Sequence, residues 1–245
     1  MITTTIVHKC RSCESTNIVK NGHNRCGNQQ YKCKDCGTHR VLQPKHNGYS
    51  EDEKATICRA SLERVSMRGL TRIFNVSRQT VKKWIKESVQ RLPPLIDTIA
   101  KLEKGDVLEV DEMWTFGGSK KNKRWLWTVM CRRTRQIIAF VIGDHSKKSC
   151  QKLWNRIPEG YRQCASFSDF WASYDNVFPS ETHQSVGKET GETAHIERWY
   201  GTLRQRLARV VRQTLSFSKS EPWHHMFIKW FITLHNQQCL SSLTR

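Results

Sequence analysis

Two Cys-x-x-Cys motifs near the start of the chain constrain its fold more than any other feature. Cys10 and Cys13 form the first motif, and Cys33 and Cys36 form the second after nineteen intervening residues. Motifs at this spacing are typical of a zinc ribbon, in which two tight turns bring four thiolates into a tetrahedron. A segment of about 45 residues buries little core, so metal binding would supply most of its folding free energy. We therefore expect a Zn²⁺-binding ribbon over residues 1–46.

The alternative is that these four cysteines form two disulfides. Disulfide frameworks belong mainly to exported proteins, whereas the N-terminal segment lacks the basic start and apolar core of a secretory signal. Zinc is therefore the better prediction. Four further side chains are spare candidate ligands, although we expect them to be surface or packing residues: His8, His23, Cys26 and His39.

The charge of the chain indicates the kind of partner. Its 245 residues include 41 Lys and Arg against 22 Asp and Glu, a formal net charge of +19. Such a surplus favours a polyanion, most simply nucleic acid; the alternative is a merely soluble basic surface. No apolar run approaches the roughly 20 residues of a membrane span, so we expect neither a membrane protein nor a secreted one.

Three helices are expected after the ribbon, over residues 51–65, 67–74 and 77–90. Ser50 with acidic residues after it, and Ser77 before the third helix, are typical N-terminal caps. We expect residues 47–90 to be a helix-turn-helix DNA-binding domain; the alternative is an ordinary three-helix bundle with a solvated basic face. Its core would consist of apolar side chains at helical spacing, namely Leu70, Ile73, Phe74, Val76, Val81, Trp84 and Ile85.

The polar side chains of the third helix would face DNA. Arg and Gln near a helix N-terminus suit base edges in the major groove, and lysines suit phosphates. The expected DNA-binding residues of this helix are Arg78, Gln79, Thr80, Lys82, Lys83 and Lys86.

The pattern changes from helical to strand-like after a linker at residues 91–105, which contains two prolines and a short helical piece near 95–102. The order of the elements that follow is that of a ribonuclease H-like α/β fold, which we expect over residues 106–245 of a multidomain α+β protein. The predicted strands are 107–116, 125–132, 136–142, 165–170 and 180–186, and the predicted helices are 146–157, 192–215 and 221–237.

Three acidic residues lie where such a fold would place its chemistry. Asp111 lies in the first strand, Asp169 at the end of the fourth, and Glu197 in the first turn of the long helix. Carboxylates that converge from such elements can hold two Mg²⁺ or Mn²⁺ ions, which suit in-line attack on a phosphodiester. Five other acidic residues remain rival candidates for the metal ligands: Glu109, Glu112, Asp175, Glu189 and Glu192. We expect substitutions at Glu109, Asp175 and Glu192 to be mild.

Motifs along nearly the whole chain resemble the transposases of the insertion-sequence-one family of bacterial mobile elements. They are the four-cysteine motif, Ser77–Val81, Val110–Trp114 with Trp125–Trp127 behind it, Ser168–Tyr174, His195–Arg198, Leu203–Arg206 and Thr214–Ser218. The resemblance implies a catalytic Asp-Asp-Glu (DDE) set, which maps to Asp111, Asp169 and Glu197.

The resemblance also implies a function. The protein would be a DNA transposase in the bacterial cytoplasm, associated with the nucleoid, that binds terminal inverted repeats and target DNA as a homo-oligomer, at least a dimer. The alternatives are a zinc-dependent transcription regulator and a nuclease of the same fold without strand transfer. Arginines of the long helix would flank the metal site and clamp the DNA ends, unless they form a solvated face: Arg198, Arg204, Arg206, Arg209 and Arg212.

Three tryptophans near these motifs have two interpretations. Aromatic side chains can stack on unpaired bases, but at such positions we expect core residues instead. The tryptophans are Trp114, Trp171 and Trp199.

Overall fold

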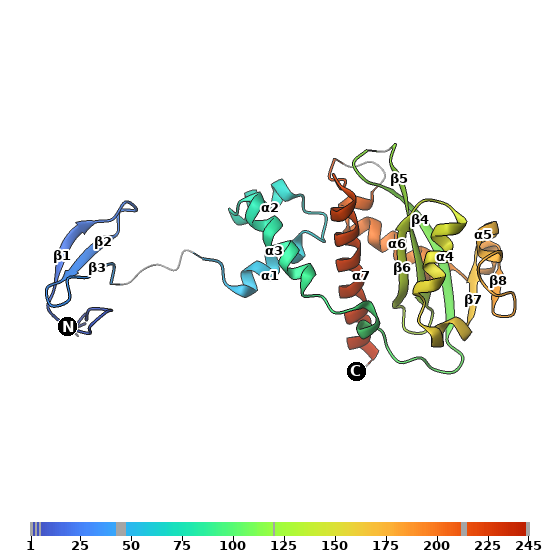
Figure 1. The fold of residues 1–245 in the computed structure, drawn as a ribbon, viewed down its shortest axis with the longest axis horizontal. Coiled ribbons are helices and arrows are strands. Elements are labelled where there is room, and N and C mark those ends of the chain that lie inside the picture. The colour runs from blue at the N-terminus through green and yellow to red at the C-terminus, as the bar shows by residue number, and fades with distance from the viewer. Residues whose placement is uncertain are drawn as a thin grey trace. The chain divides into compact units, whose positions relative to one another are not determined.

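The computed structural model describes residues 2, 4, 6–42, 48–119, 121–211 and 215–243 (Figure 1). It divides into two compact units, residues 1–50 and 51–245. Within the described residues lie two sheets and seven α-helices, which confirms the predicted mixed α+β composition. Arg212, predicted to contact DNA, lies outside the described residues.

The N-terminal unit is a small antiparallel sheet with almost no apolar core. Of its described residues, Cys10 and Cys33 alone are buried. The sheet therefore depends on something other than core burial for its stability. Its strands, in the order β1-β2-β3, are β1 (Ile18–His23), β2 (Gln29–Cys33) and β3 (His39–Arg40).

Both cysteine motifs close with the same backbone turn. The N–H of Glu14 donates to the carbonyl of Cys10 at 2.9 Å, and the N–H of Gly37 donates to that of Cys33 at 3.0 Å. Both residues have positive φ, 59° for Glu14 and 69° for Gly37. Glycine adopts this left-handed conformation without a steric penalty, so the second turn is the less strained of the two.

Three helices begin the second unit. The Ser66 hydroxyl accepts from the N–H of Gly69 at 3.0 Å, and the Ser77 hydroxyl accepts from that of Thr80 at 3.1 Å, so each serine satisfies a free amide of a first turn. The helices pack around buried Leu70, Val81 and Ile85. They are α1 (Glu51–Ala60), α2 (Met67–Phe74) and α3 (Arg78–Gln90).

Three predictions about residues 51–102 differ from the structure. The first helix, predicted over 51–65, ends at Ala60, because the chain turns through residues 61–64 and the N–H of Arg64 donates to the carbonyl of Arg206 at 2.7 Å instead of within a helix. Ile73, predicted to lie in the core, is 65% exposed, since α2 buries the side of the helix that carries Leu70. The short helical piece predicted near 95–102 is a single 3₁₀ turn at Leu95–Thr98.

A five-stranded sheet forms the centre of the second unit, in the order β6-β5-β4-β7-β8. The first three strands pair antiparallel, whereas β7 pairs parallel to β4 and β8 parallel to β7. The central strand β4 therefore has an antiparallel neighbour on one side and a parallel neighbour on the other. The strands are β4 (Val107–Phe116), β5 (Lys123–Cys131), β6 (Ile137–Gly143), β7 (Ala165–Ser168) and β8 (His183–Ser185).

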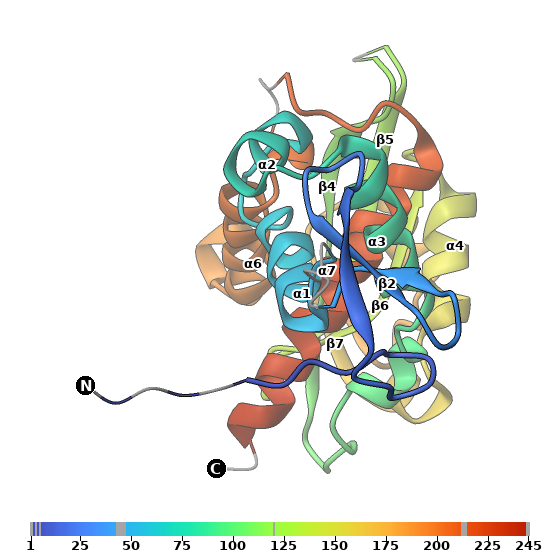
Figure 2. The same ribbon diagram turned by 90° about the vertical axis from the view of Figure 1, so that its left-hand side faces the viewer.

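Helices cover both faces of this sheet, with α4 and α6 on opposite sides (Figure 2). Leu108 and Val110 of β4 point into the core beneath α4, which includes Leu153. The intervening residues of β4 face α6, because side chains alternate along a strand. The helices are α4 (Lys147–Arg156), α5 (Ala172–Asp175), α6 (Ala194–Arg206) and α7 (Glu221–Leu243).

The predicted long helix over 192–215 is wrong in length. Helix α6 ends at Arg206, and a 3₁₀ turn follows at Ala208–Val210. Leu207 and Val210 are buried, so leaving the helix allows both apolar side chains to reach the core. The last helix continues to Leu243, beyond its predicted end at 237. The other strands and helices predicted after residue 106 have observed bounds within three residues of the predicted ones. Within the described ranges, no helix has an apolar stretch sufficient to cross a membrane.

A buried asparagine fastens α7 to the edge of the sheet. The Asn236 side chain accepts from the N–H of Ile137 at 2.8 Å and donates to its carbonyl at 2.9 Å. The same amide donates to the Thr98 hydroxyl at 3.2 Å. One side chain thus replaces the neighbouring strand that β6 lacks at this position.

Substitution of Asn236 by alanine should destabilise this unit. Two backbone groups of Ile137 would lose their partners in a buried place, which costs about 2–4 kcal/mol in the free energy of unfolding. Denaturant unfolding followed by far-ultraviolet circular dichroism measures the change. Gln237→Ala is the control, since Gln237 is the exposed next residue of the same helix, and equal losses in the two variants would contradict this account.

Candidate functional site

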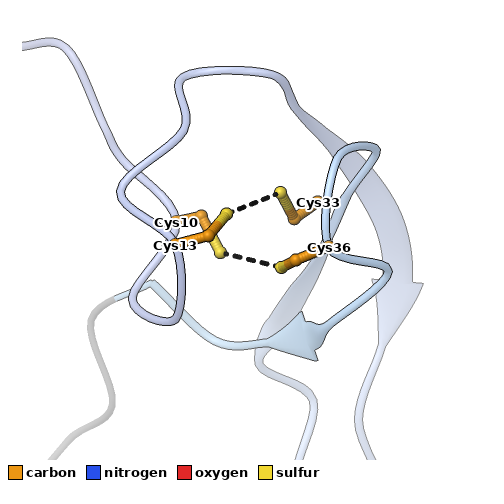
Figure 3. A group of neighbouring side chains, drawn as sticks. All are labelled: Cys10, Cys13, Cys33 and Cys36. Atoms are coloured by element: carbon orange, nitrogen blue, oxygen red, sulfur yellow. Dashed lines mark hydrogen bonds between the residues drawn. The ribbon is translucent and has the colours of Figure 1, made fainter.

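The four cysteines of the N-terminal unit converge on one point (Figure 3). The Sγ atoms of Cys10 and Cys36 are 3.6 Å apart, as are those of Cys13 and Cys33, and all four lie within 4.8 Å of one another. A tetrahedral zinc site with bonds near 2.3 Å has sulfur–sulfur edges of about 3.8 Å, whereas a disulfide requires about 2.05 Å. The cluster therefore fits a metal ion and not two disulfides.

The surroundings of the cluster shift the pKa values of its thiols in opposite directions. The hydroxyl and N–H of Thr38 lower the pKa of Cys36 to about 6. Backbone N–H groups of Ser12 and Cys13 lower the pKa of Cys10. The neighbouring Cys36 thiol and burial raise the pKa of Cys13 to about 12. Since the thiolate is the form that binds metal, the contacts of Cys10 and Cys36 favour metal binding. The spare candidate ligands do not belong to the group that the structure brings together, which among described residues consists of four cysteines.

The three carboxylates predicted to bind Mg²⁺ come from three different elements. Asp111 lies in β4, Asp169 is the first residue after β7, and Glu197 lies in the first turn of α6. Glu109 of β4 is paired with Phe167 of β7 in parallel register. When that register is continued by two residues, Asp169 lies beside Asp111 on the same face of the sheet.

Helix α6 packs on this same face. The hydroxyl of Tyr200 donates to the main-chain carbonyl of Asp111 at 2.7 Å. Glu197 precedes Tyr200 by three residues, so it lies on the same side of the helix, one turn earlier. The helix therefore brings Glu197 near Asp111 and Asp169, and the negative charges of Asp169 and Glu197 act together on the pKa of Asp111.

The charges of these carboxylates interact. Burial, together with the negative charges of Glu112, Asp169 and Glu197, raises the pKa of Asp111 well above its usual value. In the part of the chain that the structure describes, none of the three predicted ligands forms an ion pair with a lysine, arginine or histidine. A group of carboxylates without a protein cation is suited to bind a metal cation.

The spacing of the three carboxylates differs from that of the cysteines. Among described residues, only the cysteine cluster has ligand atoms that all lie within 4.8 Å of one another, so the carboxylates are further apart. The three predicted ligands are thus not gathered as closely as the four thiols are.

The rival acidic residues have other surroundings. Glu109 is bonded to Arg132 and His195. Glu112 is bonded to Nε2 of His145 at 3.0 Å and to the hydroxyl of Tyr174. Asp175 and Glu189 are exposed, and Asp175 accepts from the Ser185 hydroxyl at 2.6 Å. Glu192 forms an ion pair with Arg132 at 2.7 Å.

The arginines predicted to clamp DNA ends have different surroundings from one another. Arg198 is exposed on α6, and Arg204 is half-buried. Arg206 forms an ion pair with Glu63, in which its Nε lies 2.9 and 3.1 Å from the two carboxylate oxygens. The guanidinium of Arg209 lies 3.7 Å from the Phe227 ring centroid, and burial lowers its pKa to about 10. Arg206 and Arg209 are thus occupied within the protein.

The polar face of α3 borders two cavities. Arg78 and Lys82 line a cavity of about 800 Å³ between α2, α3 and the segment that precedes α7. Lys82 also lines a second cavity of about 510 Å³, with Gln79, Lys83 and Lys86. Thr80 differs from its neighbours, because its hydroxyl lies 2.8 Å from that of Ser77 at the helix cap.

Sequence analysis missed three cations of the larger cavity, Arg68 and Arg72 of α2 and Lys219 before α7. Arg68 and Arg72 are four residues apart and so share a helix face, a signal that was present in the sequence. Lys219 has no local signal, because its position depends on how α7 packs. The cavity thus has basic side chains on two sides, which favours a polyanion.

Sequence analysis also missed an exposed aromatic side chain beside the carboxylates. Phe170, directly after Asp169, is 71% exposed. Its neighbour Trp171 packs inward, with its ring centroid 4.2 Å from that of His145 and 4.9 Å from that of Trp127. Trp199 is buried, as expected.

Comparisons with known proteins show what this chain is similar to. Residues 107–238 match the family model described as IS1 transposase. The insertion element iso-IS1n protein InsB of Shigella dysenteriae is 34% identical over 131 residues, which cover 53% of this chain and 95% of that protein. The insertion element IS1 protein InsB of Shigella flexneri is 31% identical over 130 residues, 53% of this chain and 96% of that protein.

A longer match reaches further along the chain. The insertion element IS1 9 protein InsB of Escherichia coli (strain K12) is 29% identical over 160 residues, which cover 65% of this chain and 90% of that protein. The matched family segment contains β4 to β8 and α4 to α6 with all three predicted carboxylate ligands. On these matches, the chain belongs to the IS1 transposase family.

Proposed function

We propose that this protein is a DNA transposase that binds the terminal inverted repeats of an insertion sequence and performs metal-dependent strand cleavage and strand transfer. The observation that carries the proposal is that carboxylates from three elements lie near one another on one face of the sheet, since burial and the negative charges of Glu112, Asp169 and Glu197 raise the pKa of Asp111. The strand order supports a ribonuclease H-like domain: three antiparallel strands, two parallel ones, and helices on both faces.

The three carboxylates would hold two Mg²⁺ or Mn²⁺ ions. When bound, such ions supply a Lewis acid at the scissile phosphate and lower the pKa of the attacking water. The protein keeps the oxygens in place: Asp111 lies in the central strand, and the N–H of Trp171 donates to Asp169 at 3.3 Å. Cleavage by water would leave a 3′-hydroxyl, which then attacks a phosphodiester of target DNA without a covalent enzyme intermediate.

Both the ribbon and α3 are proposed to bind DNA, each in its own unit. Helix α3 would enter the major groove as the second helix of a helix-turn-helix, with Arg78 and Gln79 at base edges and its lysines at phosphates. Arg68, Arg72 and Lys219 extend this basic surface beyond α3. Because both ends of an element must be joined, we propose at least a dimer on DNA.

Substitution of one catalytic carboxylate should abolish the chemistry and leave DNA binding intact. Asp111→Asn, Asp169→Asn and Glu197→Gln each remove a metal ligand and keep the shape of the side chain, so cleavage and strand transfer should fall together by about 1,000-fold or more. A cleavage assay on labelled element ends with Mg²⁺, beside gel-shift binding, measures both. Asp175→Asn is the control, since Asp175 is exposed and bonded to Ser185.

The outcomes of this assay separate the alternatives. Normal cleavage by all three variants would refute the two-metal mechanism and favour a transcription regulator. Metal-dependent nicking by the natural protein without joined strands would favour a nuclease.

Loss of one zinc ligand should unfold the N-terminal unit alone. Cys33→Ser removes one of its two buried side chains and a thiolate, so zinc should be released and DNA binding weakened while residues 51–245 remain folded. Metal analysis and limited proteolysis measure these effects. Cys26→Ser should change neither, because Cys26 is exposed and outside the cluster. Purified natural protein without zinc would contradict the prediction.

Substitutions in α3 should separate base recognition from phosphate binding. Arg78→Ala should cost about 1–3 kcal/mol on the cognate end and little on random DNA. Lys83→Ala should weaken both DNAs alike and reduce the dependence of affinity on salt. Fluorescence anisotropy at several salt concentrations measures both effects, and an equal loss on the two DNAs for Arg78→Ala would remove it from the recognition surface.

A further inference from the structure

The most completely bonded carboxylate near the site is not one of the three proposed ligands. Glu109 of β4 is fully buried. Its Oε1 lies 2.9 Å from Nε of Arg132 and 2.6 Å from Nδ1 of His195. Its Oε2 accepts from the N–H groups of His195 and Ile196, both at 3.0 Å. Both oxygens thus have two partners, which uses the accepting capacity of a carboxylate.

Two of these partners are amides of the first turn of α6. The residue before this helix, Thr193, makes no side-chain cap, although the first amides of a helix have no partner within it. Glu109 takes the place of that cap from the central strand of the sheet. Its negative charge also lies at the positive end of the helix dipole, where it is stabilising.

Arg132 completes the attachment. Besides its bond to Glu109, its guanidinium donates to the carbonyl of Glu192 at 2.6 Å and forms an ion pair with that residue's carboxylate at 2.7 Å. Its own N–H donates to the carbonyl of Val107 at 2.8 Å. Arg132 therefore balances the buried charge of Glu109 and fixes the segment before α6 to β4.

We propose that Glu109 is a positioning residue, which holds the first turn of α6 against β4 and thereby sets the distance between Glu197 and Asp111. This inference rests on the proposed function of those two carboxylates. Asp111 is two residues from Glu109 on the same face of β4, about 6.8 Å along the strand. Glu197 directly follows Ile196, whose amide Glu109 binds. One side chain thus connects the two elements that carry these proposed ligands.

This placement changes an expectation from the sequence. Glu109 and Glu192 were expected to be mild controls for the catalytic carboxylates, but they form a single network with Arg132 at the start of α6. Substitution of Glu109 leaves two helix amides and a guanidinium without their partner. The cleavage rate should then fall because Glu197 moves, while the DNA-binding surface on α3 stays unchanged.

A matched control exists at the beginning of the same strand. Asp106 is also buried and is bonded to an arginine, with Arg133 Nε at 2.6 Å and the N–H of Glu103 at 2.9 Å. None of these partners lies in α6. Asp106→Asn therefore reproduces the loss of a buried acid–arginine pair without disturbing the helix that carries Glu197.

The experiment compares Glu109→Gln, Asp106→Asn and Glu197→Gln in the full chain. Single-turnover cleavage of pre-bound element ends is measured against Mg²⁺ concentration, at a temperature where circular dichroism shows each variant folded. Glu109→Gln should lower the maximal rate or the apparent Mg²⁺ affinity about 10- to 100-fold, with unchanged DNA affinity. Asp106→Asn should leave rate and Mg²⁺ dependence near those of the natural protein even if it melts earlier.

The remaining outcomes distinguish failure of the positioning role from failure of the catalytic proposal. If Glu197→Gln is inactive but Glu109→Gln behaves like Asp106→Asn, the positioning role is overturned and the catalytic proposal stands. If Glu197→Gln cleaves normally, the catalytic proposal itself fails. If Glu109→Gln does not fold, Arg132→Lys is used in its place. The lysine keeps the charge but cannot bridge Glu109 and Glu192, so the Mg²⁺ dependence of cleavage should shift in the same direction. An unshifted Mg²⁺ dependence would overturn the positioning role.

Discussion

The side chains of strand β4 alternate between the two faces of the sheet, so neighbouring residues have different surroundings. Leu108 and Val110 point into the apolar core beneath α4. Glu109 and Asp111 point toward α6, where one binds the helix and the other lies among carboxylates. A shift of register by one residue would bury Asp111 in the core and expose the apolar face. The pairing of β4 with β5 and β7 therefore determines both the stability of the unit and the place of its chemistry.

The two units are stabilised by different interactions. Residues 51–245 have a conventional core, in which large side chains such as Trp127 and Phe227 are fully buried. The N-terminal unit buries two cysteines among its described residues and has backbone turns that aim four thiolates at one point. If the cluster binds Zn²⁺ as proposed, folding of this unit is linked to metal and to pH, since thiolates bind metal and thiols do not.

Local patterns predicted most of the elements, and distant contacts explain the failures. The cysteine spacing predicted the cluster, and the alternating pattern predicted β4 with its correct bounds. The end of α6 was wrong because Leu207 and Val210 leave the helix for the core. The contacts of Glu109 and the exposure of Phe170 were missed as well. Glu109 binds a helix that lies 86 residues further along the chain, a contact that no local periodicity contains.

Helix α6 is held at both ends by other parts of the chain. Its first turn is bound by Glu109, and the carbonyl of Arg206 in its last turn accepts from Arg64 of the three-helix region, beside the ion pair with Glu63. Thirteen residues at 1.5 Å each make a rod of about 20 Å, and a hydrogen-bonded helix resists compression along its axis. If α3 binds DNA as proposed, a displacement of α1–α3 would therefore be transmitted along α6 to the turn that carries Glu197. Under the proposed function, α6 would then couple the position of the DNA-binding helices to the geometry of the carboxylates.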